Sequence, residues 1–357
     1  MDPKRMIDTF CELVKVPSET PNDKEFIVHL EKLLKKEGAK TVRDSFGNLI
    51  ATIPAKNSSS KEYLAFGCHA DTVKPGIGIE PVIKDGIIRS KGETILGADD
   101  KAGIAIILEM LRSAKKHPPL EFIVTRCEEM GTEGSSKLDY SLIQSKMAYV
   151  LDEESAEEVI IGAPTKFAFY VEYKGESAHA SEPENGVSAV VPAAKAISKL
   201  RLGRLADGST ANVGVFEGGE VTNGIPSSAK IIAECRSVNH ETALKIADEM
   251  EQIFKQSAEE YKVKIDLKKE IKYYSFLLPE DSKVVKIAVD ALAKNGVKAK
   301  TKVITGGLDA NNFNRNGIQT AALGVGYRDI HTKDEYLIIE EMEKVAKSVI
   351  DIVEFLA

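Results

Sequence analysis

Two adjacent aspartates, Asp99 and Asp100, lie between glycines in the stretch 96–103, directly before the apolar run 104–108. Ionised carboxylates beside a buried segment are costly unless a cation or hydrogen-bond donors compensate them. The stretch therefore indicates a site whose other members lie elsewhere in the chain.

Other side chains of the metal-ligand type follow apolar runs that have the length of buried strands. His69 follows the first of these runs, Glu128 and Glu129 follow the second, and Asp152 follows the third. Strands buried on both faces read as continuous apolar runs, and in an open α/β sheet their carboxyl ends meet at the site. Zinc accepts histidine nitrogen and carboxylate oxygen, and two such ions can serve one hydrolytic centre. The candidate ligands are His69, Asp99, Glu129, Asp152 and the late His331.

Each candidate also has a structural interpretation. A single strand-end histidine is more often a surface or core residue than a ligand, and Glu128 with Glu129 alone would be a solvated pair. Asp100 is interpreted as a carboxylate at a helix start, where the helix dipole favours it. Cys68 and Cys127 are interpreted as small buried strand residues rather than as thiolate ligands.

The elements that must position these residues alternate between predicted helices and strands up to about residue 164, which is typical of an α/β fold. From Lys166 the pattern becomes β-α-β-β-α-β, typical of a small antiparallel sheet with helices. We therefore predict an α/β fold with a mixed, mostly parallel sheet between helices, plus an inserted α+β (ferredoxin-like) domain. The predicted segments are 1–164 for the first part of the main domain, 165–271 for the insertion and 272–357 for the second part.

Composition narrows the class of protein. The 357 residues are 43% hydrophobic and 29% charged, as in ordinary globular proteins, and the net charge of −7 provides no footprint for nucleic acid. No apolar run is long enough for a membrane span, and the N-terminus lacks a signal core. The four cysteines form no C-x-x-C pair. These features predict a cytoplasmic enzyme with no nucleic-acid or membrane partner.

Five motifs occur in the order found in the M20 family of dinuclear zinc peptidases, and the chain resembles its peptidase T branch over essentially its whole length. The motifs are His69-x-Asp71, the segment 97–103, Glu128-Glu129-x-Gly131, Asp152 and His331. The resemblance implies a zinc-binding domain and a lid domain that also forms the interface of a homodimer.

The resemblance also implies two zinc ions per subunit. His69, Asp99 and Asp152 would bind one ion, and Asp99, Glu129 and His331 would bind the other. Asp99 would then bridge the two ions.

Three further residues have catalytic roles by the same resemblance. Asp71 would orient His69 through a hydrogen bond to its second ring nitrogen. Glu128 would be the general base for a water activated by the metal pair. Neighbours in an extended strand end point to opposite sides, so Glu128 and Glu129 need not share a role. His179, in a lid motif, would donate a hydrogen bond to the oxyanion from its own or the partner subunit; an exposed loop histidine is the alternative.

Four residues are candidates for substrate binding. Arg236 resembles an arginine that grips a substrate carboxylate, and a surface ion pair is its alternative. Asn223 lies in a glycine-rich stretch, and Asp309 and Asn311 follow Gly306-Gly307 in a loop that resembles a substrate loop. For these three, a structural role in a turn is the alternative.

The predicted function is a zinc-dependent exopeptidase, an aminopeptidase of the tripeptidase type that acts on short peptides. One alternative is an M20-type amidohydrolase or deacylase, or a carboxypeptidase, acting on N-acyl amino acids. Aspartate at position 152 resembles the aminopeptidase and tripeptidase members of the family, whereas several deacylases carry glutamate there. A metal-binding scaffold without catalysis is a remote alternative, which the presence of Glu128 disfavours.

Overall fold

The computed structural model describes all 357 residues. The chain divides into two compact units, residues 1–163 with 276–357, and residues 164–275. The expected boundaries lay after residues 164 and 271. The later one falls further on because the last strand of the insertion continues to Tyr273.

The first unit is built on a nine-stranded sheet with the order β1-β2-β6-β3-β7-β16-β8-β14, and β15 pairs with β8. Its strands are β1 (Lys40–Arg43), β2 (Leu49–Ile53), β3 (Leu64–His69), β6 (Leu120–Thr125), β7 (Met147–Glu153), β8 (Glu158–Ala163), β14 (Phe276–Leu277), β15 (Lys300–Val303) and β16 (Gln319–Gly324). The four central strands, β6, β3, β7 and β16, pair in parallel, so their carboxyl ends lie along the same edge.

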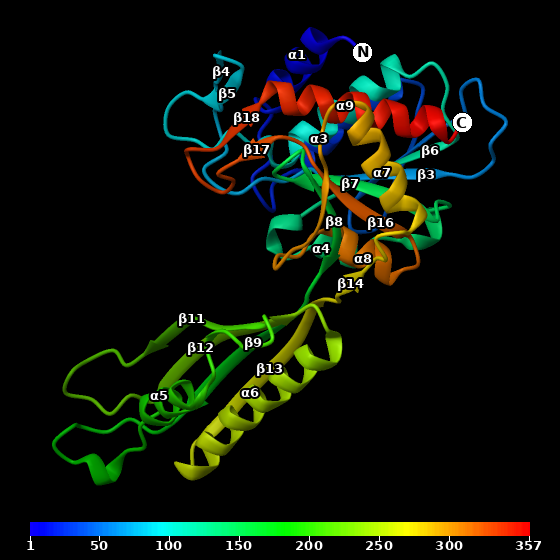
Figure 1. Cartoon of the computed structure of the whole chain (residues 1–357). Helices are drawn as coiled ribbons and strands as arrows, with labels where there is room; N and C mark the ends of the chain where they lie inside the picture. The colour runs from blue at the N-terminus through cyan, green and yellow to red at the C-terminus, as the bar shows by residue number, and fades with distance from the viewer. The chain divides into compact units, whose positions relative to one another are not determined.

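Helices pack on both faces of this sheet (Figure 1). On one face α1, α3, α7 and α9 form a continuous layer, and α4 and α8 pack together on the other. The helices of this unit are α1 (Pro3–Leu13), α2 (Lys24–Lys36), α3 (Ala98–Ser113), α4 (Glu133–Ser136), α7 (Lys283–Lys294), α8 (Asp309–Arg315) and α9 (Ile339–Phe355).

Helix α3 is the central helix of its layer, and every residue from Ala98 to Leu111 is buried. The apolar run 102–108 within it follows from contacts with α1, α9, β3 and β7, since a helix segment covered on all sides needs no polar face. A Cβ on Gly103 would lie 2.5 Å from the carbonyl oxygen of Leu151. Glycine therefore lets the start of α3 approach β7 closely.

A second, four-stranded sheet has the order β17-β18-β5-β4. It consists of β4 (Pro81–Lys84), β5 (Ile87–Ser90), β17 (Tyr327–Arg328) and β18 (Tyr336–Ile338). The loop between β17 and β18 carries His331. None of these strands was expected from the sequence, because they are two to four residues long and, with few buried residues, show no clear apolar period.

The second unit holds an antiparallel sheet with the order β10-β11-β12-β9-β13. Its strands are β9 (Thr165–Lys174), β10 (Gly203–Arg204), β11 (Thr210–Gly218), β12 (Ser228–Ser237) and β13 (Lys264–Tyr273). Helices α5 (Val190–Lys199) and α6 (His240–Glu260) pack together against one face of this sheet (Figure 1). Alternate residues of β9, such as Phe167 and Phe169, are buried in the core of this unit.

The predicted fold class, a mixed α/β domain with an inserted α+β domain, is confirmed. The large sheet holds four parallel and four antiparallel pairings, the parallel ones mainly in its middle. It is therefore less dominated by parallel pairs than expected. No helix is both long and apolar enough to cross a membrane.

Candidate metal centre and active site

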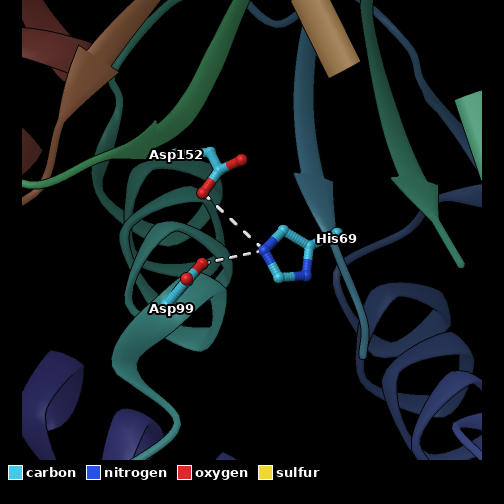
Figure 2. Close-up of side chains that lie close together, drawn as sticks. All are labelled: His69, Asp99 and Asp152. Atoms are coloured by element: carbon cyan, nitrogen blue, oxygen red, sulfur yellow. Dashed lines mark hydrogen bonds and ion pairs between the residues drawn. The ribbon is translucent and has the colours of Figure 1, made fainter. Parts of the chain in front are cut away.

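The first group of ligand-type side chains comes from the ends of two central strands and the start of α3. Figure 2 shows His69 at the end of β3 facing Asp99 and Asp152. His69 Nε2 lies 2.8 Å from Asp99 Oδ1 and 3.7 Å from Asp152 Oδ1. One imidazole nitrogen and two carboxylate oxygens thus converge within 4.8 Å of one another, as a metal site of mixed nitrogen and oxygen ligands requires.

The second group shares Asp99 with the first. His331 Nε2 lies 3.3 Å from Asp99 Oδ2 and 3.0 Å from Glu129 Oε2. The two oxygens of Asp99 therefore face different histidines, Oδ1 towards His69 and Oδ2 towards His331. This is the arrangement that a carboxylate bridging two ions needs.

The electrostatics of both groups fit cations. Burial acts against the charged form of His69, yet the surrounding carboxylates, Asp152 first among them, hold its pKa well above the ordinary value. Hydrogen bonds to Asp99 and Glu129 raise the pKa of His331 to about 10. Glu129 Oε1 is buried without a hydrogen-bond partner. The raised histidine pKa values show that the carboxylates favour positive charge here, and Glu129 Oε1 has no hydrogen-bond partner. Both features suit a cluster that holds two metal ions.

Asp71 makes different contacts from those expected. The second ring nitrogen of His69, Nδ1, lies 2.8 Å from the backbone oxygen of Asp71 and 3.6 Å from its carboxylate. The carboxylate accepts hydrogen bonds from the backbone N–H groups of Glu128, at 2.9 Å, and Glu129, at 3.3 Å, and from the hydroxyl of Thr20. The backbone of Asp71 thus orients His69, and its side chain holds the turn that carries the two glutamates.

Glu128 and Glu129 lie in a 3-10 turn, Glu128–Met130, and not in an extended strand end. The alternation of an extended strand, which was the expected reason for their different roles, is therefore wrong. The chain leaves β6 through Cys127 in the left-handed region, with φ of 53°, and this reversal forms the turn. Glu129 faces His331, and Glu128 lines the neighbouring cleft.

A cleft of about 440 Å³ opens beside both groups. Among the residues that line it are Asp99, Glu128, Glu129, Asp152, Tyr327, His331 and the loop 302–308. The glycines Gly306 and Gly307 belong to this loop, which leaves its backbone accessible from the cleft. The cleft has room for part of a short peptide next to the ligand groups.

Asp309 and Asn311 lie elsewhere than expected. Asp309 is 1% exposed and Asn311 0% exposed, and neither lines the cleft. Both belong to α8, a helix that was not expected from the sequence. Asp309 accepts a hydrogen bond from Thr125 at the end of β6, and burial raises its pKa to about 6. This burial is what the alternative, a structural role for both residues, requires.

The remaining predicted residues belong to the second unit. His179 and Asn223 are exposed and lie in adjacent segments, joined by a hydrogen bond from the N–H of Ala180 to the oxygen of Asn223, at 2.9 Å. His179 Nδ1 accepts a hydrogen bond from the backbone N–H of Ser181, at 3.2 Å, and lies 2.7 Å from the hydroxyl oxygen of the same residue. Arg236 Nε donates to Glu234 Oε1, at 2.8 Å, so this guanidinium has a carboxylate partner within its own sheet.

Two residues around the centre were missed from the sequence. Tyr327 donates its hydroxyl to Asp152 Oδ1, at 2.9 Å, and so fixes a ligand candidate. Glu335 accepts hydrogen bonds from the backbone that leads to Asp99. Both lie within a few residues of His331, and this closeness was the only signal in the sequence.

Comparison with known proteins agrees with this geometry. Residues 165–262 match the model of a peptidase dimerisation domain, and residues 48–181 match that of peptidase family M28. The uncharacterized protein YqjE of Bacillus subtilis (strain 168) is 38% identical over 365 residues, which cover 98% of each chain.

Two crystal structures match 100% of this chain, and the match covers 99% of the chain in each of them. The aminopeptidase PepT from Bacillus cereus ATCC 10987 has a TM-score of 0.90 at 38% identity. A tripeptidase from Staphylococcus aureus subsp. aureus mu50 has a TM-score of 0.94 at 34% identity. The chain therefore belongs to the M20 family of peptidases, as a metal-dependent exopeptidase similar to peptidase T.

Proposed function

We propose that the protein is an aminopeptidase that removes the N-terminal residue from short peptides, tripeptides among them, with two zinc ions in each subunit. The observation that carries the proposal is the position of Asp99, whose two oxygens face His69 and His331 beside a cleft lined by Glu128. The likeness to an aminopeptidase and a tripeptidase over the whole chain supports this choice of substrate.

The residues that would hold the ions are those of the two groups. His69, Asp99 and Asp152 would hold one ion, and Asp99, Glu129 and His331 the other. Imidazole and carboxylate ligands suit zinc. When bound, the ions would polarise the peptide carbonyl and make water a stronger nucleophile.

Glu128 would act as the general base. Its side chain lines the cleft beside both ligand groups, and burial raises the pKa of its carboxyl above the ordinary range. Glu128 would accept the proton of the attacking water and then deliver it to the amine of the departing fragment. Asp71 would hold the Glu128 backbone in place during both transfers.

His179 would donate its Nε2 proton to the oxyanion that forms on the substrate carbonyl, and removal of such a donor lowers turnover about 10²–10³-fold. The backbone N–H of Ser181, which donates to Nδ1, favours the tautomer that this role needs. The match of residues 165–262 to a peptidase dimerisation domain supports a homodimer.

Four free cysteines support a reducing compartment, the cytoplasm. For Asn223 and Arg236 we keep the role of substrate contacts.

The test combines substrates and one variant. The zinc-loaded enzyme is offered a free tripeptide, the same tripeptide with an acetylated N-terminus, and an N-succinyl amino acid. We expect cleavage of the free tripeptide alone, with the N-terminal residue as product. Glu128→Gln should keep both metal ions and lose about 10²–10⁴-fold in kcat, the usual share of general base catalysis.

Glu133→Gln is the matched control, because Glu133 lies in α4 close to the turn, pairs with Lys137 and does not line the cleft. It should keep the activity of the wild type. Cleavage of the N-succinyl amino acid in place of the tripeptide would establish a deacylase. Full turnover by Glu128→Gln would refute the assigned base.

A further inference from the structure

Glu335 accepts hydrogen bonds from four consecutive backbone N–H groups. Its Oε2 accepts from Leu96 and Gly97, both at 2.8 Å, and its Oε1 accepts from Ala98, at 2.7 Å, and Asp99, at 3.2 Å. The residue is 1% exposed. One buried carboxylate therefore satisfies all the donors of the segment that ends at Asp99.

The backbone of this segment is shaped for an anion. Gly97 has φ of 70° and ψ of 31°, in the left-handed region. A left-handed residue within such a run turns successive N–H groups towards one point, as in the anion-binding concavities called nests. Glycine adopts this conformation without the steric cost of a Cβ. The Gly97 of the motif is thus explained by the carboxylate that its segment surrounds.

Glu335 also joins two ligand-bearing segments. It lies four residues after His331, just before β18, and its own N–H donates to the oxygen of Thr332, at 3.3 Å. Strand β18 in turn pairs with β5. The loop that carries His331 is therefore tied through Glu335 to the segment that carries Asp99, its partner at 3.3 Å.

We infer that Glu335 is the positioning residue of this centre: by gathering the N–H groups of residues 96–99 it sets where the Asp99 carboxylate lies between His69 and His331. The inference rests on the proposed metal centre. Glu335 does not line the cleft and belongs to neither ligand group, and so it acts through the segments that carry Asp99 and His331.

Glu335→Gln tests this with little change of shape. One oxygen becomes an NH₂ group, so two of the four N–H groups face a donor and lose their acceptor. Displacing an outer partner of a metal ligand weakens metal binding about 10–100-fold. We expect a loss of this size for Zn²⁺, measured by titrating the metal-free protein in a calorimeter, where turnover plays no part.

Glu121→Gln is the matched control. Glu121 is 0% exposed and accepts from the backbone N–H groups of Gln144 and Ser145, at 2.9 Å each, but it lies at the opposite end of β6 from the centre. It should lower the melting temperature of the metal-free protein without changing Zn²⁺ affinity.

Wild-type Zn²⁺ affinity in Glu335→Gln, even with a lower melting temperature, would show a purely structural role and overturn the inference. If Glu335→Gln does not fold, Glu335→Asp takes its place. This variant keeps the charge but moves it away from the N–H groups. Unchanged Zn²⁺ affinity in Glu335→Asp would likewise overturn the inference. A wild-type protein that takes up no Zn²⁺ would refute the proposed metal centre instead.

Discussion

Asp99 and Asp100 are neighbours with the same functional group, yet they lie in different surroundings, and we expect opposite results when each is changed to asparagine. Asp99 offers one oxygen to each ligand group. Asp100 is fully buried, and its Oδ2 lies 3.3 Å from the backbone N of His69. Asp99→Asn should therefore remove both metal ions, and Asp100→Asn should keep them.

The size of the first effect follows from the geometry. Without the Asp99 carboxylate, each group keeps two of its three ligand side chains. Removing even an outer partner of a metal ligand lowers metal affinity by up to about 100-fold. Removing a direct ligand should lower the affinity for each ion by at least that factor. This equals about 2.8 kcal/mol per ion, or about 10⁴-fold for the pair.

The second variant should fold as the wild type does. In Asp100→Asn the side-chain amide oxygen can still accept the His69 N–H, and burial raises the pKa of the Asp100 carboxyl well above its ordinary range. The amide therefore replaces a group whose charged form is disfavoured there, although its NH₂ group takes the position of Oδ1, which has no hydrogen-bond partner, and so the melting temperature should fall somewhat. Circular dichroism melts of the metal-free proteins check that both variants fold.

The assay is equilibrium dialysis of the metal-free proteins against Zn²⁺, followed by atomic absorption, with Co²⁺ absorption spectra as a second measure of coordination. We expect two bound ions in the wild type and in Asp100→Asn, and none at the same free Zn²⁺ in Asp99→Asn. Loss of metal in Asp100→Asn and retention in Asp99→Asn would place the bridging ligand one residue later and refute this assignment.

Two further predictions concern a turn and a surface ion pair. Asp71→Asn should lower kcat about 10–100-fold with both metal ions retained, because one of the charge-assisted bonds to the N–H groups of Glu128 and Glu129 is lost. Steady-state kinetics checks this, and an unchanged kcat would contradict it. Glu31 bonds with Lys35 and Arg43, which lower its pKa from 4.5 to about 2, so its stabilisation is complete above pH 4.5 and is lost as the pH falls towards 2. Glu31→Gln should then lower the free energy of unfolding at pH 7 by about 1 kcal/mol, the scale of a surface ion pair. Urea titrations should show the difference in unfolding free energy between wild type and variant shrinking as the pH falls. A difference that stays constant down to pH 3 would count against this reasoning.

Local patterns in the sequence were enough to predict most large elements. The apolar runs before His69, Glu128 and Asp152 are the buried strands β3, β6 and β7, as predicted. A long apolar run bounded by polar turns predicts its element reliably, because such a run is stable in water only as a buried strand or helix. The same patterns place His69 and Asp152 at strand ends, and parallel pairing of β3 with β7 then brings the two together.

Short elements escaped prediction for a physical reason. Strands β4 and β5 form one local hairpin and β17 and β18 another, and the two hairpins are joined only by the pairing of β18 with β5, which lie far apart in the sequence. Helix α8 packs against strands such as β16 and β3. Elements held in this way need no apolar period of their own. The error over Glu128 and Glu129 has the same origin. Whether the chain stays extended after β6 depends on the anchor at Asp71, 57 residues earlier.

The sequence by itself therefore determined the types of chemical group, their order, and the strands and helix that carry them. Only the tertiary structure decided which oxygen of Asp99 faces which histidine, what the Asp71 carboxylate binds, and that Glu335 holds a segment more than 230 residues earlier. Burial follows from composition and period, which a linear sequence displays. Hydrogen-bond partners depend on positions to within a few tenths of an ångström, and these are set only when the remote segments have packed together.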